Sequence, residues 1–138
     1  MLTANDKWAI AETLSLHGHL FDGGLLDRLD ELFTPDVVYD ISEFGYDVLQ
    51  GIDEIRDIAL RLGPDNPLAH IVTNIVINGG PDDDTATVWS KALSVLAADR
   101  CSTATYHDTV RRGADGWRIS HRRIERRDTP LGGRSAAT

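Results

Sequence analysis

The first part of the chain places apolar side chains at helical spacing. Residues 5–21 carry a stripe at intervals of four, three and four residues, the spacing of one buried helix face; its members are Ile10, Leu14, His17 and Phe21. This pattern predicts a helix capped by Asn5, with His17 pointing inward. Two shorter helices are expected over residues 25–33 and 53–62, because a proline-containing turn ends each of them.

The pattern then changes from helices to strands. A strand is expected over residues 37–42, and from Ala69 onward strand-like segments are separated by turn residues. The three breaks are Gly79-Gly80-Pro81-Asp82, Ala98-Asp99-Arg100 and Gly113-Ala114-Asp115-Gly116. Four long strands joined by such turns predict an antiparallel meander. Helices followed by an antiparallel sheet are typical of the α+β class, with the helices packed on one face of a curved sheet.

Composition indicates one small domain and argues against two classes of binding partner. The 138 residues, 41% of them hydrophobic, suffice for a buried core, so we expect one domain over residues 1–128 and a disordered Gly-, Ser- and Ala-rich tail over 129–138. The 22 acidic and 14 basic residues give a net charge of -8, which argues against nucleic acid or an anionic membrane as partner. Cys101 is the single cysteine, and no apolar stretch approaches the roughly 20 residues of a membrane span, so a cytoplasmic location is expected.

The main candidates for chemistry are an acid and a histidine far apart in the sequence. Asp22 stands where the first helix breaks at two glycines, and His70 opens a β-branched strand. A carboxylate at a helix C-terminus faces the negative end of the helix dipole, so its burial calls for a partner. If Asp22 and His70 meet, they form an acid–base pair at an apolar pocket, because a carboxylate fixes the tautomer of an imidazole that moves protons near neutral pH. The alternative is a solvated turn aspartate and a strand-end histidine bonded to a carbonyl.

Three further polar residues are candidate lining residues of that pocket. His17 is either a core histidine or a second proton donor on the buried helix face. Asn74 shares a strand face with His70, because side chains alternate along a strand. Strict alternation puts His121 on the same face as the apolar residues that precede it, from which it can approach the cavity. The alternative for His121, as for His107, is the outer or dimer-facing side of the sheet.

Motifs for bound groups are missing from the sequence. No cluster of His, Cys and acidic residues has the spacing of a metal site, and no glycine-rich loop follows a strand as a phosphate-binding motif would. We therefore expect neither a metal nor a cofactor.

Four segments of the chain resemble one protein superfamily. They are "HLFDGGLLDRLDELFTPDVVYD", "LQGIDEIRD", "HIVTNIVI" and "YHDTVRRGADGWRISHRR" with its Gly-Trp hairpin, and the resemblance covers most of the chain. The superfamily is that of the nuclear transport factor 2-like or SnoaL-like proteins, which includes scytalone dehydratase, bile-acid 7α-dehydratase, ketosteroid isomerase and polyketide cyclases. The resemblance implies a cone in which three N-terminal helices close over a bent sheet and enclose an apolar pocket. It also implies a homodimer or higher homo-oligomer formed through the outer face of the sheet.

The resemblance gives the candidate residues roles. Asp22 and His70 match the Asp–His pair of the dehydratases, in which the histidine exchanges protons with the substrate and the aspartate orients it. His17 falls where the bile-acid type carries a tyrosine, and two tyrosines of the scytalone type are also replaced. These departures point to a changed substrate or reaction. Tyr39 and Tyr46 can supply a phenol from nearby positions.

Together these expectations describe a cofactor-free acid–base enzyme that acts on a small, largely apolar cyclic molecule of polyketide or steroid type. A dehydratase, which is a lyase, is the leading expectation, with an isomerase or a cyclase of the same fold as alternatives. A second class is a non-catalytic ligand-binding module, or a partner like the small subunit of ring-hydroxylating dioxygenases. The two classes differ in whether Asp22 and His70 are kept together inside the cavity.

Overall fold

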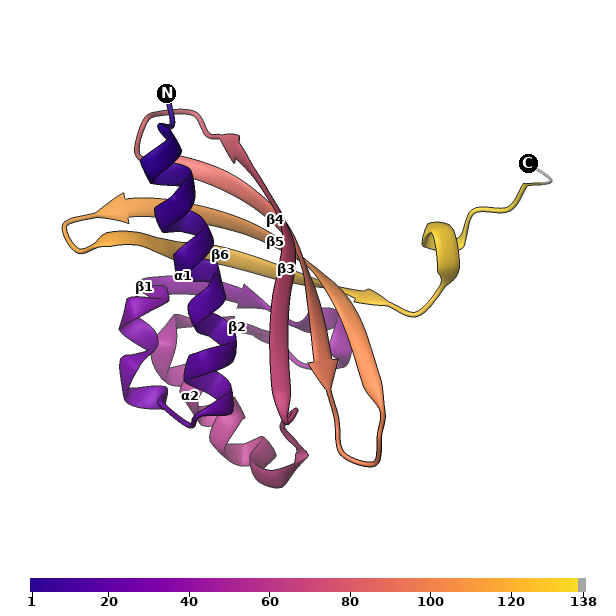
Figure 1. Cartoon of the computed structure of the whole chain (residues 1–138). Helices are drawn as coiled ribbons and strands as arrows, with labels where there is room; N and C mark the ends of the chain where they lie inside the picture. Colours follow the sequence, from indigo (N-terminus) through magenta and orange to yellow (C-terminus); the bar gives the residue numbers. More distant parts are fainter. Residues whose placement is uncertain (137–138) are drawn as a thin grey trace.

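A long helix lies across one face of a six-stranded curved sheet (Figure 1). The computed structural model describes residues 1–136, and its strands run in the order β2-β1-β6-β5-β4-β3. Helix α1 (Ala4–Asp22), the 3₁₀ helix η1 (Leu26–Glu31) and helix α2 (Gly51–Leu62) lie on the same side of the sheet. The predicted α+β class, with helices on one face of a curved sheet, is confirmed.

Helix α1 begins with a capping box rather than at the predicted cap. The Thr3 hydroxyl accepts a hydrogen bond from the Asp6 backbone N–H, and the Asp6 carboxylate accepts one from the Thr3 backbone N–H. This reciprocal pair satisfies two backbone donors at once, so Asn5 lies inside the first turn and the prediction of Asn5 as cap was wrong. The predicted stripe does face inward: Ile10, Leu14 and His17 are buried, and Phe21 is half-buried.

The predicted meander is present, with its turns at the expected breaks. Each strand is antiparallel to the next; the four are β3 (Ala69–Gly79), β4 (Thr85–Val95), β5 (Cys101–Gly113) and β6 (Gly116–Arg127). On the far side of β6, strand β1 (Phe33–Asp40) pairs with it in parallel. Strand β2 (Val48–Gln50), which the sequence did not predict, pairs antiparallel with β1. The sheet is therefore mixed at this edge, because the long connection between β1 and β6 permits a parallel pair.

The remaining segments are short. The second predicted helix is the 3₁₀ helix η1, and three further 3₁₀ helices follow: η2 (Ser42–Phe44), η3 (Gly63–Asp65) and η4 (Pro130–Gly133). Residues 137 and 138, at the end of the tail for which we expect disorder, lie outside the described residues. Within the described part of the chain, no helix is both long and apolar enough to cross a membrane.

Two β-bulges decide which polar side chains face inward. In β6 the register against β5 shifts at Ser120, which is an extra residue without a direct partner. Inward-facing positions change parity there, so Ile119 is buried before the bulge and Arg122 after it, whereas His121 is exposed. A second bulge, in β3, contains Asn74, whose φ of 55° is left-handed and whose side chain is exposed.

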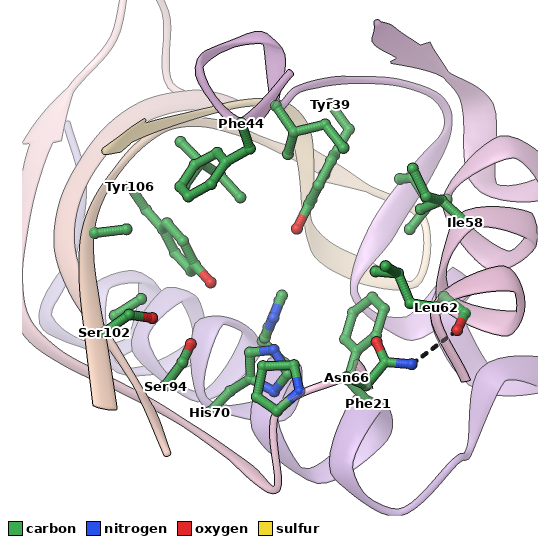
Figure 2. Close-up of a pocket in the computed structure, with 18 of the residues that line it drawn as sticks. Phe21, Tyr39, Phe44, Ile58, Leu62, Asn66, His70, Ser94, Ser102 and Tyr106 are labelled. Carbon is green, nitrogen blue, oxygen red and sulfur yellow. Dashed lines mark hydrogen bonds between the residues drawn. The ribbon is translucent and has the colours of Figure 1, made fainter. Parts of the chain in front are cut away.

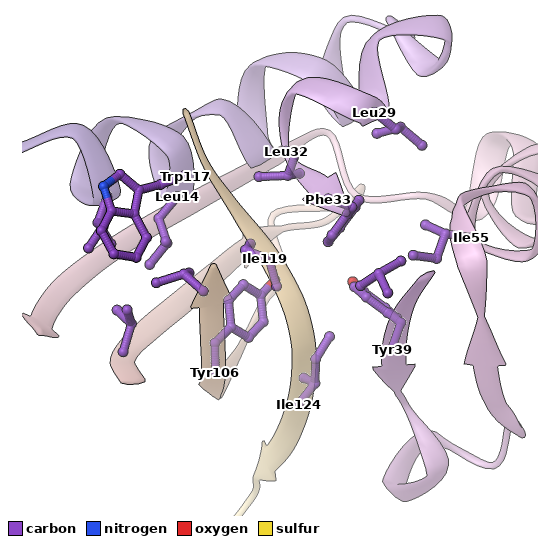
Figure 3. Packing of buried hydrophobic residues seen from close by; sticks show 14 of the residues in the cluster. Leu14, Leu29, Leu32, Phe33, Tyr39, Ile55, Tyr106, Trp117, Ile119 and Ile124 are labelled. Atoms are coloured by element: carbon purple, nitrogen blue, oxygen red, sulfur yellow. The ribbon is translucent and has the colours of Figure 1, made fainter. Parts of the chain in front are cut away.

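A hydrophobic core fills the space between the helices and the inner face of the sheet (Figure 3). Leu14 from α1, Ile55 from α2 and Ile119 from β6 are almost completely buried in it. The Thr13 hydroxyl donates a hydrogen bond to the Trp117 carbonyl and ties α1 to β6. This packing holds the helices against the sheet and sets the walls of the cavity described next.

Candidate active site

A cavity of about 230 Å³ lies between α1, α2 and the inner face of the sheet (Figure 2). Its wall is mainly apolar, with Phe21, Phe44, Ile58, Leu62 and Ile124 among the lining residues. Histidine, tyrosine, serine and asparagine side chains interrupt this wall at a few points. A mainly apolar cavity with a few converging polar groups is the usual form of a site for a small organic molecule.

Asp22 and His70 meet at this cavity and are hydrogen-bonded. Asp22 Oδ1 lies 2.6 Å from His70 Nδ1, and Asp22 Oδ2 accepts a hydrogen bond of 3.0 Å from the His70 backbone N–H. A carboxylate accepts hydrogen bonds, so Nδ1 carries the ring proton of the neutral imidazole and Nε2 keeps its lone pair. The His70 side chain is 14% exposed and lines the cavity. This geometry can orient a general base, and the catalytic role of the pair stays a prediction.

Helix α1 and strand β3 bring the pair together through a close contact at Gly18. Asp22 is the last residue of α1, and His70 is the second residue of β3. A Cβ atom at Gly18 would lie only 2.3 Å from the His70 carbonyl oxygen, so a side chain there would push the strand away. The backbone N–H of His70 also compensates Asp22 for its unfavourable place at the helix C-terminus.

His17 is fully buried on α1, five residues before Asp22, and its ring contacts the ring of His70. The two ring centroids lie 5.0 Å apart in an edge-to-face arrangement. Nδ1 of His17 lies 2.9 Å from a guanidinium nitrogen of Arg122, which forms a bidentate ion pair with Asp108. Burial, the Arg122 charge and the nearby His70 hold the pKa of His17 well below its usual value. His17 is therefore a neutral imidazole at the cavity wall.

Two tyrosines reach the cavity from opposite sides. Figure 2 shows the hydroxyl ends of Tyr39 and Tyr106 pointing toward its interior. Burial raises the pKa of both phenols, so both stay protonated and can donate hydrogen bonds at neutral pH. Tyr46 also lines the cavity but is 43% exposed. Sequence reasoning missed Tyr106, although its alternation with Asp108 and Val110 along β5 could have indicated a shared inward face.

Two of the predicted lining residues lie elsewhere. Asn74 is exposed in the β3 bulge, and His121 is exposed on the opposite face of the sheet beside His107 and Trp89. Both predictions were wrong for the same reason: a bulge breaks the strict alternation on which they relied. Asn66 and Ser94 line the cavity instead. Among the described residues, no group of three or more His, Cys, Asp or Glu side chains is arranged to hold a metal ion.

Comparison with known proteins supports the fold. A protein of unknown function with a cystatin-like fold from Nostoc punctiforme is 25% identical, with a TM-score of 0.77 over 94% of this chain and 98% of that one. The Kfla4162 protein from Kribbella flavida is 22% identical, with a TM-score of 0.75 over 90% and 92% of the two chains. A provisionally named scytalone dehydratase from Novosphingobium aromaticivorans is 20% identical, with a TM-score of 0.72 over 94% of each chain.

A search of curated proteins found no match. The family model of the SnoaL-like domain, in contrast, matches residues 2–123, which is most of the chain. The matched segment includes every residue of the cavity wall described above except Ile124. This match agrees with the curved sheet and with the helices that cover the cavity. The chain belongs to the SnoaL-like domain family.

Proposed function

We propose that the protein is a dehydratase that uses Asp22 and His70 for acid–base catalysis on a small, largely apolar cyclic molecule carrying a carbonyl and a hydroxyl group. The observation that carries the proposal is the 2.6 Å contact between Asp22 Oδ1 and His70 Nδ1 at the wall of an apolar cavity. A carboxylate at Nδ1 orients the imidazole and stabilises the imidazolium that forms when Nε2 takes up a proton.

The proposed reaction has two steps. His70 Nε2 removes a proton from the carbon next to the substrate carbonyl, and the electron pair of the broken C–H bond moves into the carbonyl to form an enolate. The enolate then collapses, the C–O bond at the next carbon breaks, and the departing hydroxyl takes the proton from His70 to leave as water. The product is a conjugated enone, and His70 returns to its neutral form.

The enolate oxygen needs hydrogen-bond donors, and three buried side chains at the cavity wall can supply them. These are the His17 ring and the hydroxyls of Tyr39 and Tyr106. A positioned general base contributes roughly 10²–10⁴-fold to a rate. Loss of one donor to a developing oxyanion costs about 10²–10³-fold. The apolar wall supports the proposal further, because it excludes water and matches an apolar ring.

The test is a screen of hydroxylated cyclic ketones, with loss of water followed by mass spectrometry and enone formation by ultraviolet absorbance. We expect His70→Ala and Asp22→Asn each to lower kcat by about 10²-fold or more while the fold is retained. His19→Ala is the matched control, because His19 is an exposed histidine on the same helix and is expected to leave turnover unchanged. Wild-type turnover in both site variants would refute the mechanism.

The same screen separates the alternatives. An isomerase with the same base would return a product of unchanged mass, because the proton is delivered to another carbon of the substrate. A cyclase would leave the cyclic ketones unchanged and would turn over an open-chain precursor added to the screen. Saturable binding of the ketones without turnover would assign the protein to the ligand-binding class instead.

A further inference from the structure

An ion pair without an assigned role in the proposed reaction lies buried next to the cavity. Arg122 on β6 and Asp108 on β5 face each other, and both side chains are 0% exposed. Two parallel hydrogen bonds of 2.7 and 2.8 Å join the guanidinium to the carboxylate. Burial alone would lower the pKa of Arg122, but the Asp108 carboxylate more than reverses this, so the guanidinium stays charged.

The same guanidinium makes a third contact, with a histidine ring. Arg122 Nη1 lies 2.9 Å from His17 Nδ1. The guanidinium carbon lies over the Tyr106 ring, 4.0 Å from the ring centroid. A guanidinium has donors and no acceptor, so Nδ1 of His17 must accept this hydrogen bond. The single proton of the neutral His17 ring therefore resides on Nε2. Because Nδ1 is taken by Arg122, Nε2 is the ring nitrogen that remains available to a molecule in the cavity that His17 lines.

We propose that Asp108 and Arg122 are positioning residues that fix His17 as its Nε2–H tautomer, so that His17 presents a hydrogen-bond donor to a substrate oxygen and does not act as a base. The substrate oxygen as the partner of His17 rests on the proposed function, whereas the tautomer of His17 follows from the contact with Arg122 alone. Two histidines with ring centroids 5.0 Å apart thereby acquire opposite roles. Asp22 leaves His70 with a lone pair at Nε2, and Arg122 leaves His17 with a proton at Nε2.

The surroundings of His17 favour this state from every side. Arg122 on β6 supplies a positive charge, and His70 on β3 would add a second charge whenever it is protonated. Tyr106 on β5 stays neutral because burial raises its pKa. Asp108 is needed because a guanidinium buried without a carboxylate would be an unpaired charge.

The first experiment measures the tautomer of the His17 ring directly in the intact protein. Long-range ¹H–¹⁵N spectra of the ¹⁵N-labelled chain, without ligand, are expected to show His17 protonated on Nε2 alone over the neutral pH range, and His70 protonated on Nδ1 when neutral. A His17 signal protonated on Nδ1, or an imidazolium signal in that range, would overturn the proposal. Because no substrate is present, failure of the proposed dehydratase activity leaves this test intact.

A paired variant tests whether the ion pair is the cause. Arg122→Met with Asp108→Leu removes both charges together. Proteins often tolerate the replacement of a whole buried ion pair by apolar residues of similar volume. We expect the His17 signal to split between tautomers or to shift toward the Nδ1–H form. The control is Arg111→Met with Asp36→Leu, which removes an exposed Arg–Asp pair on the same sheet and should leave His17 unchanged. An unchanged His17 tautomer in the buried-pair variant contradicts the proposal; should that variant not fold, the wild-type spectrum decides.

A rescue experiment tests the donor role. In His17→Gln, the side-chain carbonyl can accept from Arg122 while the amide N–H points to the cavity, so kcat on a substrate from the ketone screen is expected to stay within about 10-fold of wild type. His17→Leu removes the donor and is expected to lose about 10²–10³-fold. Equal losses in the two variants would show that His17 is structural only.

Discussion

Replacing Gly18 by alanine is expected to separate the two halves of the candidate active site. A Cβ atom there would lie 2.3 Å from the His70 carbonyl oxygen, whereas ordinary van der Waals contact begins at 3.4 Å. Helix α1 and the start of β3 must therefore move apart by about 1 Å. No rotamer change relieves this clash, because the contacted atom belongs to the backbone of a paired strand.

The displacement acts directly on the acid–base pair. Asp22 lies on α1 and His70 on β3, so a shift of about 1 Å is enough to break the hydrogen bonds of 2.6 and 3.0 Å between them. Misplacement of this size costs about 10²-fold in rate when the misplaced group is catalytic. Overpacking of this kind also lowers the free energy of unfolding by about 1–3 kcal/mol.

Three measurements check the Gly18→Ala prediction. Urea unfolding reports the free energy of unfolding, the His70 Nδ1–H proton signal reports the contact with Asp22, and kcat on a substrate from the screen reports function. Gly79→Ala is the matched control on β3, because a Cβ at Gly79 meets no atom within 4 Å. Wild-type stability together with an unchanged His70 signal in Gly18→Ala would refute the argument from close contact.

Two further predictions concern pH and assembly. The pKa of His17 is held well below its usual value in the folded protein, mainly by burial, so below about pH 6.5 the unfolded chain binds a proton that the folded protein does not. Stability is therefore expected to fall as pH decreases from about 7 to 5 in urea unfolding, and His17→Gln should flatten that slope; equal slopes would contradict the assignment. The homo-oligomer expected from the family resemblance would use the outer sheet face, where Trp89 is 54% exposed beside exposed apolar residues of β3. Trp89→Glu should then shift the protein to monomers in analytical ultracentrifugation, and a monomeric wild type would contradict this expectation.

Much of the fold was predictable because it depends on local patterns. The stripe on α1 and the turn residues between the long strands are encoded within a few residues of each other, so periodicity predicts them well. Some local choices were not decided by the sequence. Thr3 and Asn5 are both good caps, and the reciprocal bonds between Thr3 and Asp6 select the former. Strand β2 is too short to give a periodic signal.

The residues of the candidate site were also predictable only in part. The chain itself indicated an acid at the end of a helix and a histidine at the start of a strand, and the structure brings Asp22 and His70 into contact. Sequence periodicity misplaced Asn74 and His121, because a bulge forms only against a partner strand and reverses the side-chain directions that follow it.

The sequence by itself determined where the long helices and the four long strands form, since those preferences arise between near neighbours, but it did not indicate the short strand β2. Only the tertiary structure decided which polar groups meet. Arg122 could reach His17 from 105 residues away because the β6 bulge turns it inward, and Asp22 could reach His70 because Gly18 lets a helix touch a strand. Both events depend on contacts between distant parts of the chain, and local periodicity carries no information about such contacts.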